Sequence, residues 1–263
     1  MNQRIDPLTN TAYKYGFGFY ETMRAINEKI IFFDEHINRL LSSLKYFKLP
    51  IIDKKSIYST LIEKLEKKNL NDARIRITYS LQGNDLNPFI TYEVFSFKPS
   101  FQKQAKITFS KYTLKHEDKI RSFKTTNNFI YYHEFLLARK SNYDEVIFFD
   151  DGGHILEGSR TNIFFIFYEG NSGDFYLKTP SIDCGILPGI ARKKVTKLCK
   201  ELKIKVIEEA LNSTIFNEAQ EIFLTNSVHG IIPVKSTPFS KKLPIEKTEF
   251  IKSEFAERYL ITY

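Results

Sequence analysis

The chain has 263 residues, of which 42% are hydrophobic and 27% charged, the composition of a soluble globular protein with one large domain or two smaller ones. Its formal net charge is +8, but the lysines are scattered, which favours a solvated surface over a nucleic-acid site. No apolar run is long enough to span a membrane, and the N-terminus has no signal-peptide core. The two cysteines form neither a metal motif nor a disulfide framework. We therefore expect a cytoplasmic protein without a membrane, nucleic-acid or metal partner.

The first part of the chain is predicted to form helices followed by strands. Asp34 is the predicted N-cap of an amphipathic helix that Pro50 ends. In "ARIRITYS", polar residues such as Arg76 alternate with apolar residues such as Ile75, which indicates a half-buried strand. The predicted elements are helices at 32–50 and 54–68 and strands at 73–80, 90–98 and 105–112.

A charged stretch without periodicity, "TLKHEDKIR" at 113–121, is the predicted linker between a domain of residues 1–112 and a domain of residues 122–263. The alternation of helices and strands in the second part predicts a mixed α and β protein. The predicted elements there are a helix at 127–142, a strand at 144–150, a turn at 151–153, extended segments at 154–167, a Gly/Pro turn and helix at 185–202, strands at 203–209 and 221–227, and a short helix near 213–219.

Three features of the second part suggest chemistry. Lys124 lies outside the lysine-rich runs, within "SFKTTNNF"; Glu157 lies in the largely apolar "HILEGSRTNIFF"; and "GILPGIAR" opens a helix whose first amides could bind phosphate. Each has a simpler explanation, namely a loop lysine, an exposed hairpin glutamate and a tight turn. Together, however, a lysine, a carboxylate and a phosphate-binding helix start are the groups that pyridoxal phosphate needs.

Five segments in this order resemble the class-IV aminotransferase family, the fold-type IV pyridoxal-phosphate enzymes. The resemblance implies a two-domain D-amino-acid-aminotransferase-like fold, with a small α/β sandwich domain and a larger α/β barrel-like domain. It also implies pyridoxal 5'-phosphate as cofactor, a small-molecule amino substrate and a homodimer. The segments are "YGFGFYETMRAINEKIIFFDEHINRL", "FKTTN", "DEVIFFDDGGHILEGSRTNIFF", "TPSIDCGILPGIAR" and "EIFLTNSVHGIIPV".

The resemblance assigns roles to single residues. Lys124 matches the lysine that forms the Schiff base and moves protons, and Glu157 matches the partner of the pyridine nitrogen. Arg39 matches an arginine that holds the phosphate, although the helix pattern alone places it opposite the apolar stripe as a solvated charge. The residues that match the remaining phosphate donors are Ile190 and Ala191 through their amides and Ser227 through its hydroxyl.

Some positions depart from the family pattern. Phe17 replaces a usual aspartate, Ala191 replaces a usual threonine and removes one side-chain phosphate contact, and Ser227 replaces a common threonine but keeps the hydroxyl. None of these changes removes the chemistry.

The reaction is predicted from substrate-side positions. Phe129 stands five places after the lysine, where branched-chain aminotransferases usually have tyrosine, and "QGNDLNPF" lacks the Arg-x-His pair of the D-amino-acid enzymes. Asn127 occurs at its position in lyases and D-amino-acid enzymes, whereas Tyr20 resembles a substrate residue of the latter. We predict a 4-amino-4-deoxychorismate lyase that gives 4-aminobenzoate, a folate precursor, and pyruvate. The alternatives are a branched-chain or D-amino-acid aminotransferase and a non-catalytic basic binding protein of the same fold.

Overall fold

The computed structural model describes residues 5–99, 101, 104–116, 118–170, 173–240, 242–259 and 261. Residues 1–4 of the N-terminal segment and Glu117 of the predicted linker lie outside the described residues. The chain forms two compact units, each described by itself below. The N-terminal unit comprises Met1–Lys98 and Phe123–Asn128, and the C-terminal unit comprises Pro99–Ser122 and Phe129–Tyr263.

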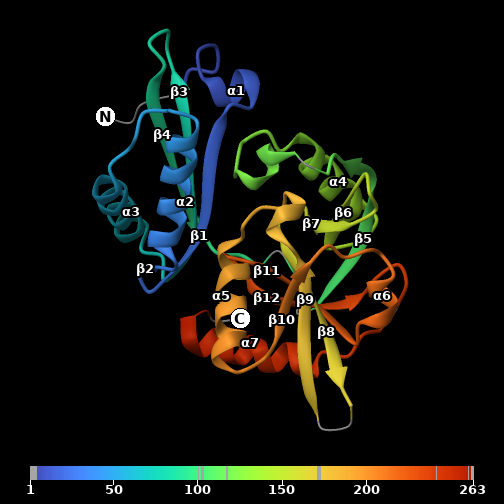
Figure 1. Ribbon diagram of the computed structural model, residues 1–263. Helices are drawn as coiled ribbons and strands as arrows, with labels where there is room; N and C mark the ends of the chain where they lie inside the picture. Colours follow the sequence, from blue (N-terminus) through green and yellow to red (C-terminus); the bar gives the residue numbers. More distant parts are fainter. Residues whose placement is uncertain are drawn as a thin grey trace. The chain divides into compact units, whose positions relative to one another are not determined.

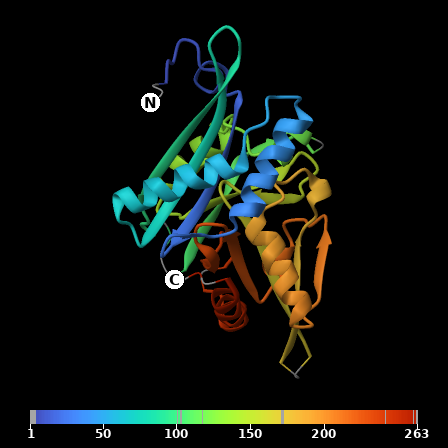
Figure 2. The ribbon, with the colours of Figure 1, turned by 90° about the vertical axis from the view of Figure 1, so that its left-hand side faces the viewer.

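The N-terminal unit is a four-stranded antiparallel sheet in the order β2-β1-β3-β4, with two long helices on one face (Figures 1 and 2). The alternation predicted for "ARIRITYS" is confirmed, since Ile75 and Ile77 are fully buried. The elements are α1 (Thr11–Tyr15), β1 (Gly18–Ile26), β2 (Lys29–Ile30), α2 (Phe33–Tyr46), α3 (Lys54–Lys68), β3 (Asp72–Gln82) and β4 (Asn87–Ser96).

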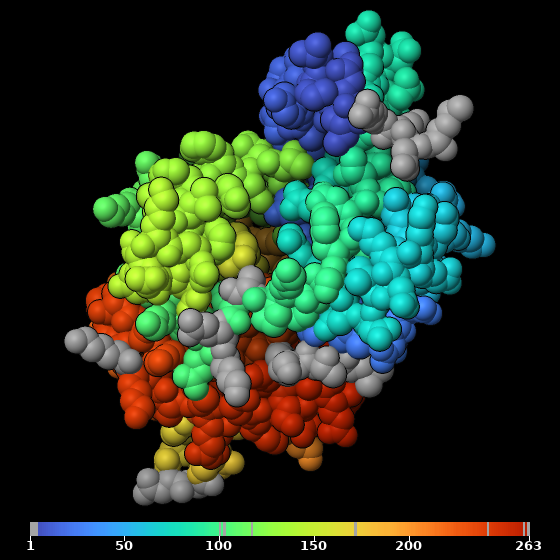
Figure 3. All heavy atoms as spheres, turned by 180° about the vertical axis from the view of Figure 1, so that it is seen from behind, coloured from blue at the N-terminus to red at the C-terminus, as the bar shows by residue number. Residues whose placement is uncertain are grey.

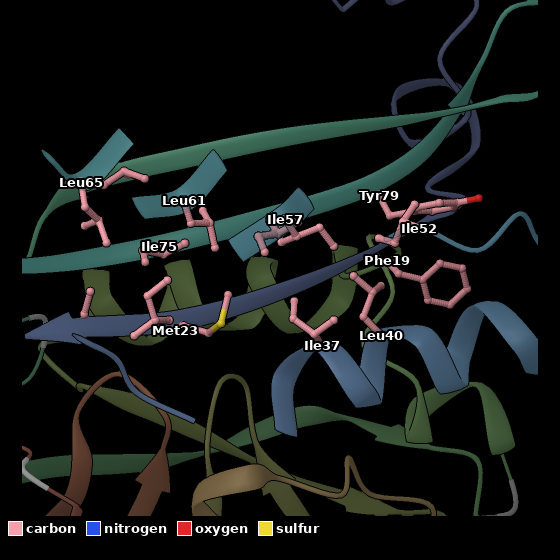
Figure 4. Close-up of a cluster of buried hydrophobic side chains, with 14 of the residues drawn as sticks. Phe19, Met23, Ile37, Leu40, Ile52, Ile57, Leu61, Leu65, Ile75 and Tyr79 are labelled. Carbon is pink, nitrogen blue, oxygen red and sulfur yellow. The ribbon is translucent and has the colours of Figure 1, made fainter. Parts of the chain in front are cut away.

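A single apolar core joins the helices to this sheet. Ile37 and Leu40 of α2 and Leu61 of α3 point toward Met23 of β1 and Ile75 of β3 (Figure 4). Full burial of each such side chain contributes about 1.5–3 kcal/mol relative to exposure. The core therefore fixes α2 against β1, and with it the polar residues that α2 carries.

The predicted start and end of α2 are wrong in detail. The helix begins at Phe33 after Phe32, whose left-handed φ of 57° turns the chain, and no side chain caps it. Asp34 lies in the first turn, where its negative charge still interacts favourably with the helix dipole. The helix ends at Tyr46, before Pro50.

The C-terminal unit is built on an eight-stranded sheet in the order β10-β9-β8-β11-β12-β5-β6-β7 (Figure 1). Its elements are β5 (Ala105–Leu114), a 3-10 turn (Lys119–Ser122), α4 (Phe129–Lys140), β6 (Glu145–Asp150), β7 (Ile155–Gly158), β8 (Asn162–Glu169), β9 (Asp174–Pro180), a 3-10 turn (Ile182–Cys184), α5 (Ile190–Glu201), β10 (Val206–Glu209), α6 (Ile215–Glu218), β11 (Glu221–Asn226), β12 (Gly230–Ser236) and α7 (Glu246–Tyr259).

This sheet curls, because the edge strand β7 also lies near β8 and β9. Helix α7 packs on β11 and β12 and against α5, and its outer surface forms most of the red area in Figure 3. The observed architecture confirms the predicted mixed α and β fold, with a smaller layered part and a larger barrel-like part. Among the described helices, none has the length and apolar character needed to cross a membrane.

The structure divides the chain differently from the predicted boundaries. β5 was expected in the first domain, but it pairs with β6 and β12 in the C-terminal unit. The expected linker at 113–121 overlaps the end of β5 and a 3-10 turn. Conversely, Phe123–Asn128 return to the N-terminal unit, where Phe123 packs on Phe47 at a ring distance of 4.9 Å.

Candidate active site

The segment that contains Lys124 forms a short edge of the N-terminal sheet. The Tyr20 amide donates to the Lys124 carbonyl at 3.0 Å, and the Thr126 amide donates to the Gly18 carbonyl at 2.9 Å. A Cβ at Gly18 would lie 2.8 Å from the Tyr79 carbonyl oxygen, so only glycine allows this close approach. Lys124 is therefore held by backbone pairing with β1.

The Tyr20 ring lies close to two cations. The Lys124 Nζ lies 4.6 Å from the centre of the Tyr20 ring, and the Arg76 guanidinium carbon lies 3.9 Å from it. Asn128 Nδ2 donates to the Tyr20 hydroxyl at 2.6 Å. Burial raises the pKa of Tyr20, but the charges of Lys124 and Arg76 and the hydrogen bonds outweigh it, so the net shift is downward.

Asn128 and Arg76 were not predicted as site residues. Asn127, which was predicted, is exposed, and a Cβ at Gly16 would lie 3.3 Å from its Cα. Arg76 could have been noticed from its position, because it shares the polar face of the predicted strand with Thr78. No signal in the sequence distinguishes Asn128 from Asn127.

Arg39 is not a solvated charge. Its guanidinium donates to both carboxylate oxygens of Glu21, at 2.8 and 2.7 Å, and Glu21 also pairs with His36 Nδ1 at 2.6 Å. The side chains of Glu21 and His36 are 1% exposed and that of Arg39 is 14% exposed. β1 and α2 thus bring a cation into the interior beside a compensating carboxylate.

The charges of this group are strongly coupled. Burial acts to raise the pKa of Glu21, but the opposing effects of Arg39 and His36 are larger in sum. The net result is a pKa lowered from 4.5 to about 2. Ionised Glu21 therefore contributes stability above pH 4.5 that is lost as the pH falls toward 2. Burial lowers the pKa of His36, and the charges of Arg39 and Lys124 act in the same direction. Lys124 and this group both belong to the N-terminal unit.

Glu157 occupies β7 of the C-terminal unit and is 7% exposed. Asn162 Nδ2 donates to its Oε2 at 3.3 Å, and the Leu187 amide donates to the same oxygen at 3.2 Å. Burial, followed by the charge of Glu157, raises the pKa of Tyr131 on α4. The alternative of an exposed hairpin glutamate is therefore wrong, because the carboxylate is buried and held by directed donors.

The start of α5 lies next to this glutamate. Gly189 is its N-cap, no side chain caps the helix, and Ile190 and Ala191 occupy its first two positions. A Cβ at Gly189 would lie 1.9 Å from Asn162 Oδ1, so glycine is required. Asn162 Nδ2 also donates to the Leu187 carbonyl at 3.1 Å and so connects Glu157 to this turn. An uncapped helix start of this kind is suited to an anion.

Ser227 lies in the turn between β11 and β12, and Asn226 Oδ1 shapes that turn by accepting the Val228 and His229 amides at 3.1 and 2.8 Å. One residue before Asn226, Thr225 pairs with Asn162 across the β11–β8 ladder. The C-terminal unit therefore brings Glu157, the start of α5 and this turn together.

Several buried polar atoms of these regions lack a hydrogen-bond partner among the described residues. They include Nε2 of His36, the hydroxyl oxygen of Tyr131, Nε of Arg192 and Oγ1 of Thr225. Leaving such a group unpaired costs about 1–3 kcal/mol, and a bound polar ligand could satisfy it. Cationic, carboxylate and amide groups are also the donor and acceptor types that a phosphorylated pyridine requires, so the residues present fit pyridoxal phosphate.

The model of the family described as amino-transferase class IV matches residues 18–237. The chain belongs to the class-IV aminotransferase family. Members of this family, aminotransferases and lyases alike, use pyridoxal phosphate. Membership confirms the prediction of a pyridoxal-phosphate enzyme over a non-catalytic binding protein.

Relatives of this class-IV enzyme carry two activities in their names. A Methanocaldococcus jannaschii protein named "Putative branched-chain-amino-acid aminotransferase" is 32% identical over 84% of this chain and 78% of its own. The aminodeoxychorismate lyase of Bacillus subtilis is 27% identical, and the match covers 84% of this chain and 78% of the relative. The solved branched-chain amino acid aminotransferase of Escherichia coli is 22% identical, covers 98% of this chain and 90% of its own, and has a TM-score of 0.86. The last comparison shows the shared fold.

Proposed function

We propose that the protein is a 4-amino-4-deoxychorismate lyase that gives 4-aminobenzoate and pyruvate. The observation that supports this choice is the polar, cationic face of the N-terminal sheet beside Lys124. The cross-strand pairs there are Tyr20 with Thr78 and Thr22 with Arg76, none of them aliphatic. Such a face suits a substrate with more than one carboxylate better than an aliphatic amino acid, because a guanidinium pairs strongly with carboxylate.

The proposed roles of the residues are those that the family resemblance implies. Arg39, the amides of Ile190 and Ala191, and Ser227 bind the phosphate, and Glu157 keeps the ring nitrogen protonated, since an anionic neighbour favours the charged form. The bound cofactor supplies electron withdrawal from the amino-bearing carbon. Lys124 supplies the amine that holds the cofactor and accepts the proton that this carbon loses.

The elimination then balances without a second substrate. The proton leaves the amino-bearing carbon, the C–O bond to the enolpyruvyl group breaks, and the ring becomes aromatic. The released enolpyruvate takes up a proton and becomes pyruvate. No keto acid is consumed, in contrast to amino transfer.

A class-IV aminotransferase is the second candidate. It is favoured by the 32% identical relative, and Arg76 could equally pair with the second carboxylate of a dicarboxylic amino donor. In that case the proton returns to the cofactor and a keto acid is released.

One experiment separates the two candidates. Purified, cofactor-loaded protein is given 4-amino-4-deoxychorismate without a keto acid, and in parallel L-leucine, L-glutamate or D-alanine with a keto acid. We expect equal amounts of 4-aminobenzoate and pyruvate in the first reaction. Steady conversion of an amino acid with no 4-aminobenzoate would reject the lyase.

We further propose that the enzyme is cytoplasmic and that it is a homodimer, the latter as its family resemblance implies. Both described cysteines, Cys184 and Cys199, are buried and free, as expected for a reducing compartment. Sedimentation equilibrium at working concentrations tests the assembly, and a monomer alone would contradict the dimer.

A further inference from the structure

A cluster of His116, Asp150 and His154 in the C-terminal unit has no role in the proposed reaction. Each residue offers one ligand atom, and these atoms all lie within 4.8 Å of one another. We propose that this cluster is a binding site for a divalent transition-metal ion of the zinc class. A metal site was not predicted from the sequence, because the two histidines are far apart along the chain.

The sheet topology explains why these residues meet. β5 and β6 are parallel neighbours, so their carboxyl ends lie at the same edge, and β7 begins there after the turn at 151–154. The Asp151 amide donates to the Leu114 carbonyl at 2.9 Å, which fastens the turn to the end of β5. The chain beyond Leu114 then brings His116 to the site, and the turn brings His154.

Asp150 is the fixed centre of the cluster. It is fully buried, and its Oδ1 accepts the Gly152 and His154 amides at 2.9 and 2.7 Å. Its Oδ2 faces Nδ1 of His154 at 3.1 Å and Nδ1 of His116. Within the part of the chain that the structure describes, its ion pairs run only to these histidines. The guanidinium of Arg121 is bonded instead to the carbonyls of His116 and Cys184.

Two imidazole nitrogens and one carboxylate oxygen are a common donor set for Zn²⁺, with water completing a tetrahedral site. The side chains of His116 and His154 are 43% and 37% exposed, so an ion and its water can enter from solvent. The two amides that hold Oδ1 supply the outer support that metal-binding carboxylates usually have. A bound ion would tie the ends of β5 and β6 to His154, which immediately precedes β7 and lies three residues before Glu157.

The test uses the full-length, untagged, cofactor-loaded enzyme after removal of metals with a chelator. We expect ZnCl₂ titrated by calorimetry to bind at about one ion per chain and to raise the melting temperature. CoCl₂ is expected to give the visible absorption of a four-coordinate N/O site. His116→Gln and His154→Gln are each expected to weaken Zn²⁺ binding by on the order of tenfold or more. The matched control is His133→Gln, because His133 has a similarly exposed side chain on α4, outside the cluster.

Folding of each variant is checked by circular dichroism and by the visible absorption of the bound cofactor. Asp150→Asn adds a test of the carboxylate, because its remaining oxygen can still accept the two amides. If that variant does not fold, the two histidine variants decide alone. The metal site is rejected if Zn²⁺ does not bind saturably, or if His133→Gln weakens binding as much as His116→Gln and His154→Gln do. In either case the histidines serve only as hydrogen-bond partners of Asp150.

Discussion

The two units differ in how they provide polar groups. In the N-terminal unit the polar groups are mainly charged side chains on β1, β3 and α2, such as Arg39 held by buried Glu21. In the C-terminal unit many are backbone amides at turns and at the uncapped start of α5, organised around Glu157 by Asn162. Side-chain charges bind strongly but must be compensated when buried, whereas backbone donors are supplied by the fold itself. Loss of the buried charge of Arg39 in the first unit should therefore be more severe than loss of a proposed neutral phosphate contact, such as that of Ser227, in the second.

The largest expected effect is at Lys124. Lys124→Ala should reduce turnover by about 10³-fold or more, because in the proposed mechanism it removes both the amine that holds the cofactor and the group that moves the proton. Borohydride treatment of the loaded enzyme, followed by peptide mapping, should place the label on Lys124. Lys45→Ala, at an exposed position of α2, is the control and should behave like wild type. A label on another lysine would rule out this assignment.

The second effect concerns the charge of Glu157. Glu157→Gln keeps an acceptor for the Leu187 amide but loses the negative charge, so we expect cofactor to remain bound while turnover falls by about 10²-fold. Measuring cofactor absorption and turnover on the same sample separates a loss of cofactor from a loss of catalysis. Glu257→Gln, on the exposed side of α7, is the matched control. Turnover near that of wild type would mean that Glu157 is only structural.

The third effect compares the two kinds of phosphate contact directly. Arg39→Ala should weaken cofactor binding more than Ser227→Ala, because a charge-assisted contact is stronger than a neutral hydrogen bond. Arg39→Ala also removes the guanidinium that compensates buried Glu21 and leaves His36 as its remaining charged partner among the described residues, which should cost about 3–5 kcal/mol in stability.

A double variant separates stability from binding at Arg39. Glu21→Gln combined with Arg39→Ala should recover part of the stability but not the cofactor affinity. Cofactor titration and thermal unfolding of the single and double variants provide the measurements. A larger affinity loss for Ser227→Ala than for Arg39→Ala would reverse the ranking.

Sequence reasoning was most successful where a pattern is local. The alternation in β3 and the apolar stripe of α2 follow from side-chain periodicity, and both are observed. The environment of Arg39 could not be predicted this way, because its partner Glu21 lies on a different element and meets it only after α2 packs on β1. The assignment of β5 to the first domain was wrong for the same reason, since strand pairing depends on neighbours that are distant along the chain. The pairing of residues 124–126 with β1 is likewise a long-range contact. Local patterns alone predict only an ordinary loop there.

The smallest expected effect is at Tyr20, and it bears on the choice between the two reactions. Tyr20→Phe keeps the ring that Arg76 and Lys124 contact but removes the hydroxyl that accepts from Asn128. If Tyr20 serves as a wall of the substrate site, lyase turnover should change by less than about tenfold, because one hydrogen bond is worth roughly 0.5–1.5 kcal/mol net.

If the phenol instead holds the carboxylate of an amino donor, KM for that donor should rise while kcat changes little. Asn128→Ala is the paired variant, since it removes the same hydrogen bond from the other side and leaves the phenol in place. A rise in KM for Tyr20→Phe that Asn128→Ala does not reproduce would assign substrate contact to the hydroxyl and favour the aminotransferase.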